Sequence, residues 1–392
     1  MTDMRKSPTT ASVSAGYERV QQALDQVVAE QSSPSAVAEI RDESGTWFGS
    51  AGVADLGTGR PRDPGDRFHA GSVSKAFIAT ALLTLEAEGS LSLDDTVDTW
   101  LPGVVSGNGN DGTRMTIRQL LSNTSGLGVT GLSPEIVRRY HTRSGFAENR
   151  FHVWTMDELL RLQMSIPPVS APGAGFAYAN GGFQIAGAII ERATGRSYAD
   201  EIDRTVIRQL GLADTYVQDL SESRLRGQHC KAYSKGLFLR AGVDPESLTA
   251  ENYQSLLEET GGDPLDITER TYFEGPAGCV VSTTGDLLQV AHALITGSLL
   301  PPAQHRAMWT TGPTANWIPN ARYGLGVSTW PLADGRVLDV LSGMTGGTAS
   351  VTLGTPDGAL IVSLHLNGDW NWYMACYQIA EAVFGSPFDV AG

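Results

Sequence analysis

Ser72 and Lys75 are the first residues of this sequence whose types and spacing could do chemistry together. They lie in the stretch HAGSVSKAFIAT, at the start of an apolar, alanine-rich run that is typical of a buried helix. Residues three apart share a helix face, so the serine hydroxyl and the lysine amine can meet. A desolvated lysine near the positive end of a helix dipole can act as a neutral amine and take the serine proton. The pair therefore predicts a nucleophilic serine with a lysine as its base.

The alternative interpretation of this stretch is a chance S-x-x-K whose lysine reaches water. The chain has four lysines, and only Lys75 follows a serine by three residues. It is also the one placed inside an apolar helix, where an ammonium group without a purpose or a partner is costly. Both observations favour the functional interpretation.

Tyr178 and Asn180 are the second candidates, in the glycine-rich stretch GAGFAYANGGFQIAG that leads into an apolar helix. Residues two apart in an extended segment point the same way, so a phenol and an amide can face one cleft. The alternative is an ordinary loop, in which the tyrosine packs and the asparagine caps the helix.

The third candidate is the glycine-rich strand in DVLSGMTGGTASVTLGTP, near the C-terminal end of the sequence. Glycines let a substrate carbonyl approach backbone N–H groups, and such donors form an oxyanion hole. Ser342, Gly343 and Met344 are the residues that we expect to provide this surface.

The elements that must position these residues divide the chain into three parts. Apolar periodicity predicts a helix, a strand pair around a turn, and a buried helix, over residues 17–30, 36–55 and 72–88. Helices and long loops follow, and strands return only near the end, at 323–332, 336–343, 348–356 and 359–368, before a last helix over 371–384. We therefore expect two domains: an α/β domain, residues 1–75 and 276–392, with one sheet built from both ends of the chain, and an inserted all-α domain, residues 76–275.

Composition and charge exclude several classes of partner and site. The net charge of −15 is spread along the chain, which argues against nucleic acid and anionic membranes as partners. The first residues lack the apolar core of a signal peptide, and no segment approaches the length of a membrane span, so we expect a cytoplasmic protein. The widely spaced cysteines and scattered histidines have no metal-binding spacing, so we expect no metal.

Together, these stretches resemble the serine β-lactamase and penicillin-recognising DD-peptidase superfamily, most closely its class C β-lactamase and family VIII carboxylesterase branch. Two signatures of that branch, S-x-x-K and Y-x-N, stand intact as Ser72-Val73-Ser74-Lys75 and Tyr178-Ala179-Asn180. Other stretches look like family landmarks in the family's order, among them RQLLSNTSGL, PAGCVVSTTGDLLQVAHALITG and YGLGV.

The resemblance implies a β-lactamase/transpeptidase-like fold, in which helices flank an antiparallel sheet and the active site lies between the helical domain and the α/β domain. It implies that Ser72 is the acylated nucleophile, that Lys75 and Tyr178 share the proton transfers, and that Asn180 binds the substrate side chain. The backbone N–H groups of Ser72 and Met344 would form the oxyanion hole, and no cofactor is needed.

The third family signature, K-T-G, departs from the pattern. It falls on Leu341-Ser342-Gly343, which we expect to contact the substrate, so the strand cation that helps family members bind a substrate carboxylate is absent. We expect Leu341 and Met344 to make one wall of the cleft more apolar, which suits a hydrophobic acyl chain or a neutral ester.

The leading hypothesis is a serine hydrolase that cleaves small esters or amides through an acyl-Ser72 intermediate, with Lys75 as base and Tyr178 as proton shuttle. Three alternatives stay open. One is an acyltransferase or peptide cyclase of natural-product biosynthesis, which passes the acyl group to an alcohol or amine. The others are a D-stereospecific amidase, peptidase or weak β-lactamase, and a catalytically silent binding protein. We expect the stretch 236–275 to shape one rim of the cleft.

Overall fold

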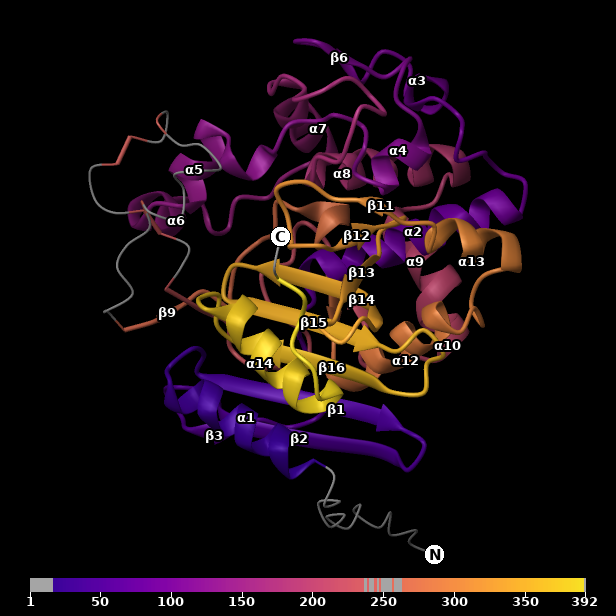
Figure 1. The fold of residues 1–392 in the computed structure, drawn as a ribbon. Coiled ribbons are helices and arrows are strands. Elements are labelled where there is room, and N and C mark those ends of the chain that lie inside the picture. The colour runs from indigo at the N-terminus through magenta and orange to yellow at the C-terminus, as the bar shows by residue number, and fades with distance from the viewer. Residues whose placement is uncertain are drawn as a thin grey trace, which may run out of the picture.

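Nine antiparallel strands form the main sheet of the computed structural model, which describes residues 17–235, 238–239, 243–244, 247, 256 and 263–390. The strand order is β11-β12-β13-β14-β15-β16-β1-β2-β3 (Figure 1). The bounds are β1 (Ser35–Asp42), β2 (Gly45–Asp55), β3 (Arg60–Pro61), β11 (Gly312–Pro313), β12 (Arg322–Tyr323), β13 (Ser328–Pro331), β14 (Val337–Thr345), β15 (Thr348–Gly354) and β16 (Ile361–Leu366). β1 pairs with β16, Ala36 opposite Leu366, so one sheet joins both ends of the chain.

Different helices cover the two faces of this sheet. α1 (Glu18–Ala29) and α14 (Trp372–Phe384) pack on one face, and α12 (Thr284–Ile295) packs on the other. Side chains of β14 alternate between the faces: Val340 packs with α1 and α14, whereas Leu341 joins the cluster on the helical side. β15 and β16 are buried on both faces, and the hydroxyl groups of Ser350 and Thr352 in β15 donate hydrogen bonds inside this core.

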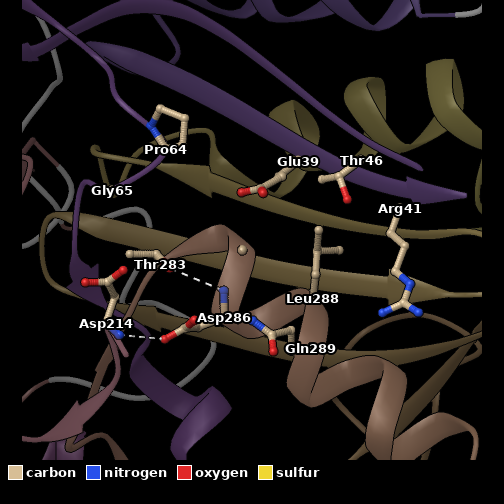
Figure 2. A pocket seen from close by; sticks show the side chains of 11 residues that line it. Glu39, Arg41, Thr46, Pro64, Gly65, Asp214, Thr283, Asp286, Leu288 and Gln289 are labelled. Atoms are coloured by element: carbon tan, nitrogen blue, oxygen red, sulfur yellow. Dashed lines mark hydrogen bonds between the residues drawn. The ribbon is translucent and has the colours of Figure 1, made fainter. Parts of the chain in front are cut away.

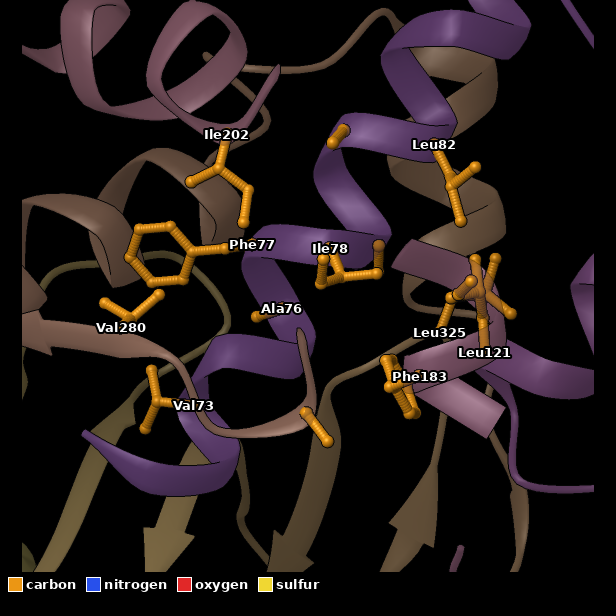
Figure 3. Packing of buried hydrophobic residues seen from close by; sticks show 14 of the residues in the cluster. Val73, Ala76, Phe77, Ile78, Leu82, Leu121, Phe183, Ile202, Val280 and Leu325 are labelled. Atoms are coloured by element: carbon orange, nitrogen blue, oxygen red, sulfur yellow. The ribbon is translucent and has the colours of Figure 1, made fainter. Parts of the chain in front are cut away.

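The helical part of the chain surrounds α2 (Ser74–Ala87), which directly follows the 3-10 turn η1 (Gly71–Val73). α2 is rich in alanine and leucine and is buried nearly all round, against residues such as Phe183, Ile202 and Val280 (Figure 3). The other helices are α3 (Val97–Trp100), α4 (Ile117–Leu121), α5 (Pro134–Tyr140), α6 (Arg143–Asn149), α7 (Met156–Met164), α8 (Asn180–Thr194), α9 (Tyr198–Ile202), α10 (Arg208–Leu210) and α13 (Pro302–Met308), with shorter turns η2 (Thr130–Leu132), η3 (Asp203–Ile207) and η5 (Gly275–Ala277).

Small sheets complete the described structure. Their strands are β4 (Phe68–His69), β10 (Val280–Ser282) and β7 (Tyr216–Val217) in one sheet, β5 (Ser106–Gly107) and β6 (Asn110–Asp111) in a second, and β8 (Tyr233–Ser234) and β9 (Leu265–Asp266) in a third. No helix in the described part of the chain is long and apolar enough to cross a membrane.

The main predictions from the sequence are confirmed. The α1–β1–β2 unit, the buried helix α2, the C-terminal strands and α14 are present, and the sheet is antiparallel with flanking helices. The domain boundaries after residues 75 and 275 stay a prediction. We expected the stretch 236–275 to shape a rim of the cleft, and most of its residues 236–262 lie outside the described residues.

Candidate active site

The turn at the start of α2 brings Ser72 and Lys75 together, as their spacing predicts. Lys75 is 1% exposed, and its Nζ donates hydrogen bonds to Ser72 Oγ (2.9 Å), Asn180 Oδ1 (2.8 Å) and the carbonyl oxygen of Ala277 (3.1 Å). All three acceptors are neutral, so the buried amine is held in place without a carboxylate in hydrogen-bonding contact. This is the arrangement expected for a lysine that exchanges a proton with a serine.

Hydrogen bonds on the side of the turn away from Lys75 hold its backbone. Ser74 Oγ donates to the carbonyl of Gly71 at 2.7 Å and accepts from the N–H of Val280 at 2.9 Å. Ser350 Oγ donates to the carbonyl of Ala70 at 3.0 Å. Because Val280 lies on β10 and Ser350 lies on β15, both sheets fix the position of the turn that carries Ser72.

Close backbone packing between η1 and β14 depends on two glycines. A Cβ at Gly343 would lie 2.0 Å from the carbonyl oxygen of Ala70 and 2.7 Å from the backbone nitrogen of Ser72. A Cβ at Gly71, which has a φ of +56°, would lie 3.0 Å from the backbone nitrogen of Met344. Glycine therefore lets the turn and the strand meet backbone to backbone.

The N–H groups of Ser72 and Met344 are both available beside this contact. A two-residue turn joins β14 to β15, so Thr345 and Thr348, which flank it, form a hydrogen-bonded pair, and pairs alternate along the ladder. Met344 lies opposite Ala349 in the other kind of pair, and its N–H points away from β15. β13 pairs with β14 only at residues 337–340, so it does not reach Met344. The Ser72 N–H belongs to the first turn of η1, where donors have no partner within the helix.

Tyr178 and Asn180 lie where α8 begins, and Asn123 holds the segment before that helix. The backbone carbonyl of Asn123 accepts from the N–H of Ala177 at 2.8 Å, and its side-chain Oδ1 accepts from the N–H of Ala179 at 3.0 Å. The Tyr178 ring is then placed with Lys75 Nζ over its face, 4.9 Å from the ring centre. Within the described residues, the Tyr178 hydroxyl has no hydrogen-bond partner.

The side chain of Asn180 contacts Lys75. Its Oδ1 accepts the hydrogen bond from Lys75, so this atom helps to fix the position of the Lys75 amine. Binding of a substrate side chain by Asn180 stays a prediction for its amide nitrogen.

Aromatic rings surround Tyr178. The Trp317 ring stacks on it with a centroid distance of 5.7 Å and an angle of 13°, and the Tyr323 ring meets it edge-on at 6.2 Å. Burial, and then the neighbouring Tyr178 phenol, raise the pKa of Tyr323 well above its usual range. Tyr323 therefore remains a neutral, buried support below Tyr178.

One expectation about the strand is wrong. Leu341 is 2% exposed and packs in the apolar cluster around α2, whereas Met344 is 46% exposed. Residues three apart on a strand lie on opposite faces, so these two side chains do not form one wall. Ser342, between Leu341 and Gly343, is half-buried and faces the side opposite to both.

Sequence reasoning missed Glu274, which lies at the edge of this site. Thr345 Oγ1 on β14 donates to Glu274 Oε1 at 3.3 Å. Burial raises the pKa of the Glu274 carboxyl, and the charges of Arg270 and Lys75 oppose that shift. A lone glutamate in the stretch EGPAG has no motif spacing that would identify it.

Asn123 and Ala277 were also missed. Asn123 has a φ of +55° directly after the C-cap of α4, a position where asparagine is tolerated. An asparagine after the helical run RQLLS could have indicated this helix end, but no local pattern indicates that it holds the Tyr178 segment. The contribution of Ala277 is a backbone carbonyl, which the identity of its side chain does not reveal.

A separate polar pocket of about 470 Å³ lies between β1, residues 64–65 and α12 (Figure 2). Glu39, Arg41, Asp214 and Asp286 are among the residues that line it, and none of the predicted site residues does. Burial raises the pKa values of Glu39 and Asp286. In the described ranges no group of three or more histidine, cysteine, aspartate or glutamate side chains could hold a metal ion.

Comparison with known proteins finds one matching family model, related proteins and similar solved structures. The family model described as Beta-lactamase matches residues 20–373. Esterase EstB of Burkholderia gladioli is 34% identical over 250 residues, which is 62% of this chain and 63% of the esterase. Penicillin-binding protein 4* of Bacillus subtilis is 28% identical over 349 residues, or 87% of this chain and 70% of that protein. The crystal structure of a D-stereospecific amidohydrolase from Streptomyces sp. has a TM-score of 0.80 and 34% identity, and the match covers 94% of this chain and 98% of the amidohydrolase.

Proposed function

The chain belongs to the beta-lactamase family, whose serine hydrolases it resembles throughout, and we propose that it cleaves small esters or amides through an acyl-Ser72 intermediate. The observation that carries the proposal is the 2.9 Å hydrogen bond between Lys75 Nζ and Ser72 Oγ. A serine is a weak nucleophile until a neighbouring base takes its proton, and Lys75 is the base in contact.

Acylation uses both predicted N–H donors and the Tyr178 hydroxyl. Ser72 Oγ attacks the substrate carbonyl carbon while Lys75 takes the Ser72 proton. The N–H groups of Ser72 and Met344 donate to the carbonyl oxygen as negative charge develops on it. When the C–O or C–N bond breaks, Tyr178 gives its proton to the leaving oxygen or nitrogen and recovers one from Lys75. The Ser72 proton thus ends on the released alcohol or amine.

Deacylation runs through the same groups with water as the second reactant. A water oxygen attacks the acyl carbon, its proton passes to Tyr178 and Lys75, and the bond to Ser72 Oγ breaks. Ser72 then regains a proton and the acid leaves. An alcohol or amine in place of water would give acyl transfer, so the acceptor alone separates the hydrolase from the acyltransferase alternative.

Two substrate series are favoured. In the register that the resemblance implies, Leu341 replaces the cation of the K-T-G signature, which supports substrates that lack a carboxylate, such as neutral esters. Amides of D-amino acids form the second series, supported by the 34% identity to a D-stereospecific amidohydrolase over 94% of this chain.

Intact-protein mass spectrometry tests the proposal. The purified chain and its Ser72→Ala variant are incubated with p-nitrophenyl butyrate, with the amides of D- and L-alanine, and with a cephalosporin. We expect a butyryl adduct and product release with the wild type, and neither with Ser72→Ala. Turnover that survives Ser72→Ala unchanged would contradict the acyl-enzyme, and transfer of the butyryl group to added alcohols in preference to water would favour the acyltransferase.

A further inference from the structure

An aromatic wall includes the ring of Tyr178. It consists of Phe176, Tyr178 and Trp317, all half-buried, with the buried Tyr323 beneath them. Phe176 lies 5.7 Å from Trp317 and 5.4 Å from Tyr323, and Trp317 lies 5.3 Å from Tyr323, measured between ring centres. Three rings are thus partly open to a ligand while the fourth supports them.

The loop that carries Trp317 is held in place at several points. Thr314 Oγ1 donates to the carbonyl of Ala321 at 2.8 Å, which closes the base of the loop. Asn320 Nδ2 donates to the carbonyl of Asp389 at 3.2 Å. Ile318 packs against the core formed by the sheet, α1 and α14. Trp317 therefore lies on a loop that is already held in place. Such preorganisation favours selective binding over nonspecific binding.

The position of the aromatic wall determines which part of a substrate it can contact. In the proposed mechanism, the N–H groups of Ser72 and Met344 bind the carbonyl oxygen, while the Tyr178 hydroxyl reaches the leaving oxygen or nitrogen. The group attached to that leaving atom must therefore begin beside Tyr178, where Trp317 stacks on the tyrosine ring and Phe176 is the next ring beyond Trp317.

We propose that Phe176 and Trp317 form a subsite for the leaving group, and that this subsite selects esters and amides of aromatic or large apolar alcohols and amines. The inference rests on the proposed function, because it uses Tyr178 as the proton donor to the leaving atom. Aromatic rings favour stacked or edge-on partners, so a benzyl group fits this wall better than an ethyl group.

Benzyl butyrate and ethyl butyrate test the subsite, because they share one acyl group and differ in the leaving alcohol. We expect Trp317→Ala to lower the kcat/KM ratio of benzyl to ethyl ester by about tenfold, the scale of discrimination for apolar groups in a pocket. Trp317→Phe should retain most of the ratio. Trp47→Ala, which removes a half-buried tryptophan stacked on Tyr17 far from the site, should leave the ratio unchanged.

The rate at which the butyryl adduct disappears separates selection from a structural effect. The leaving alcohol has departed by then, so we expect Trp317→Ala to leave this rate unchanged. Equal losses for both esters, or a slower loss of the adduct, would overturn the subsite and assign Trp317 only the support of Tyr178. A wild type that forms no Ser72 adduct and hydrolyses neither ester would overturn the proposed function itself, and the subsite with it.

Discussion

Lys75 Nζ donates a 2.8 Å hydrogen bond to Asn180 Oδ1, which ties the first turn of α2 to the first residue of α8. The same nitrogen reaches Ser72 Oγ, so a side chain more than a hundred residues along the chain orients the proposed base. The acceptor is neutral, so it adds no negative charge beside the amine, as a carboxylate in its place would.

Asn180→Asp tests the importance of this neutral acceptor. The new carboxylate would keep the hydrogen bond but favour the charged amine, which cannot accept a proton. We expect kcat near pH 7 to fall about tenfold or more, with an unchanged or higher melting temperature, and activity to recover as the pH rises. Asn180→Ala is the control, because it removes the hydrogen bond without adding charge. Full activity of Asn180→Asp at pH 7 would argue against Lys75 as the base.

Gly343→Ala tests the backbone contact between η1 and β14. The new Cβ would lie 2.0 Å from the Ala70 carbonyl oxygen and 2.7 Å from the Ser72 nitrogen, so the turn and the strand must separate. We expect the free energy of unfolding to fall by about 1–3 kcal/mol and kcat to fall with it, because the Ser72 N–H moves. Gly131→Ala is a matched control, since no atom lies within 4 Å of its Cβ position. A Gly343→Ala variant with normal kcat would exclude this contact from catalysis.

Local patterns predicted the strands, α2 and the meeting of Ser72 with Lys75, because each depends on residues close in sequence. The contacts of Asn123 with the Tyr178 segment, and of Trp317 with Tyr178, join distant segments and leave no periodic signal.

The expectation that Leu341 and Met344 form one wall of the cleft failed for a different reason. The strand period of two already places residues three apart on opposite faces, so the alternation alone could have prevented that error.

Leu341→Lys tests whether residue 341 occupies the strand position at which the K-T-G signature has its lysine. Leu341 is 2% exposed in an apolar cluster, so a lysine there should lower the melting temperature. We nevertheless expect the rate of acylation by a cephalosporin to rise relative to a neutral ester, because the ammonium can pair with the substrate carboxylate. Leu341→Met keeps the volume and lacks the charge, and it should not change this ratio. An unchanged ratio in the folded lysine variant would mean that residue 341 does not face the substrate carboxylate.

The partly buried carboxyl of Asp339 on β14 should make the free energy of unfolding depend on pH. Burial raises the pKa of its carboxyl to about 6, from an ordinary value of 3.8. The folded protein thus holds this proton more tightly than the unfolded chain. The resulting stabilisation of the fold is fully present below pH 3.8 and is lost as the pH rises through 6. At pH 7.5 the charged carboxylate destabilises the fold, by about 1–2 kcal/mol after allowance for its partial exposure to solvent.

Asp339→Asn should therefore raise the melting temperature at pH 7.5, by about 2 °C or more, and the gain should shrink steadily toward pH 4. Thermal unfolding of both proteins across this range measures the difference. Asp334→Asn is the control of opposite sign: Arg336 donates to the Asp334 carboxylate and lowers its pKa, so its removal should give no gain at pH 7.5. A gain for Asp339→Asn that is constant from pH 4 to 7.5 would show that packing, and not ionisation of this carboxyl, determines the effect.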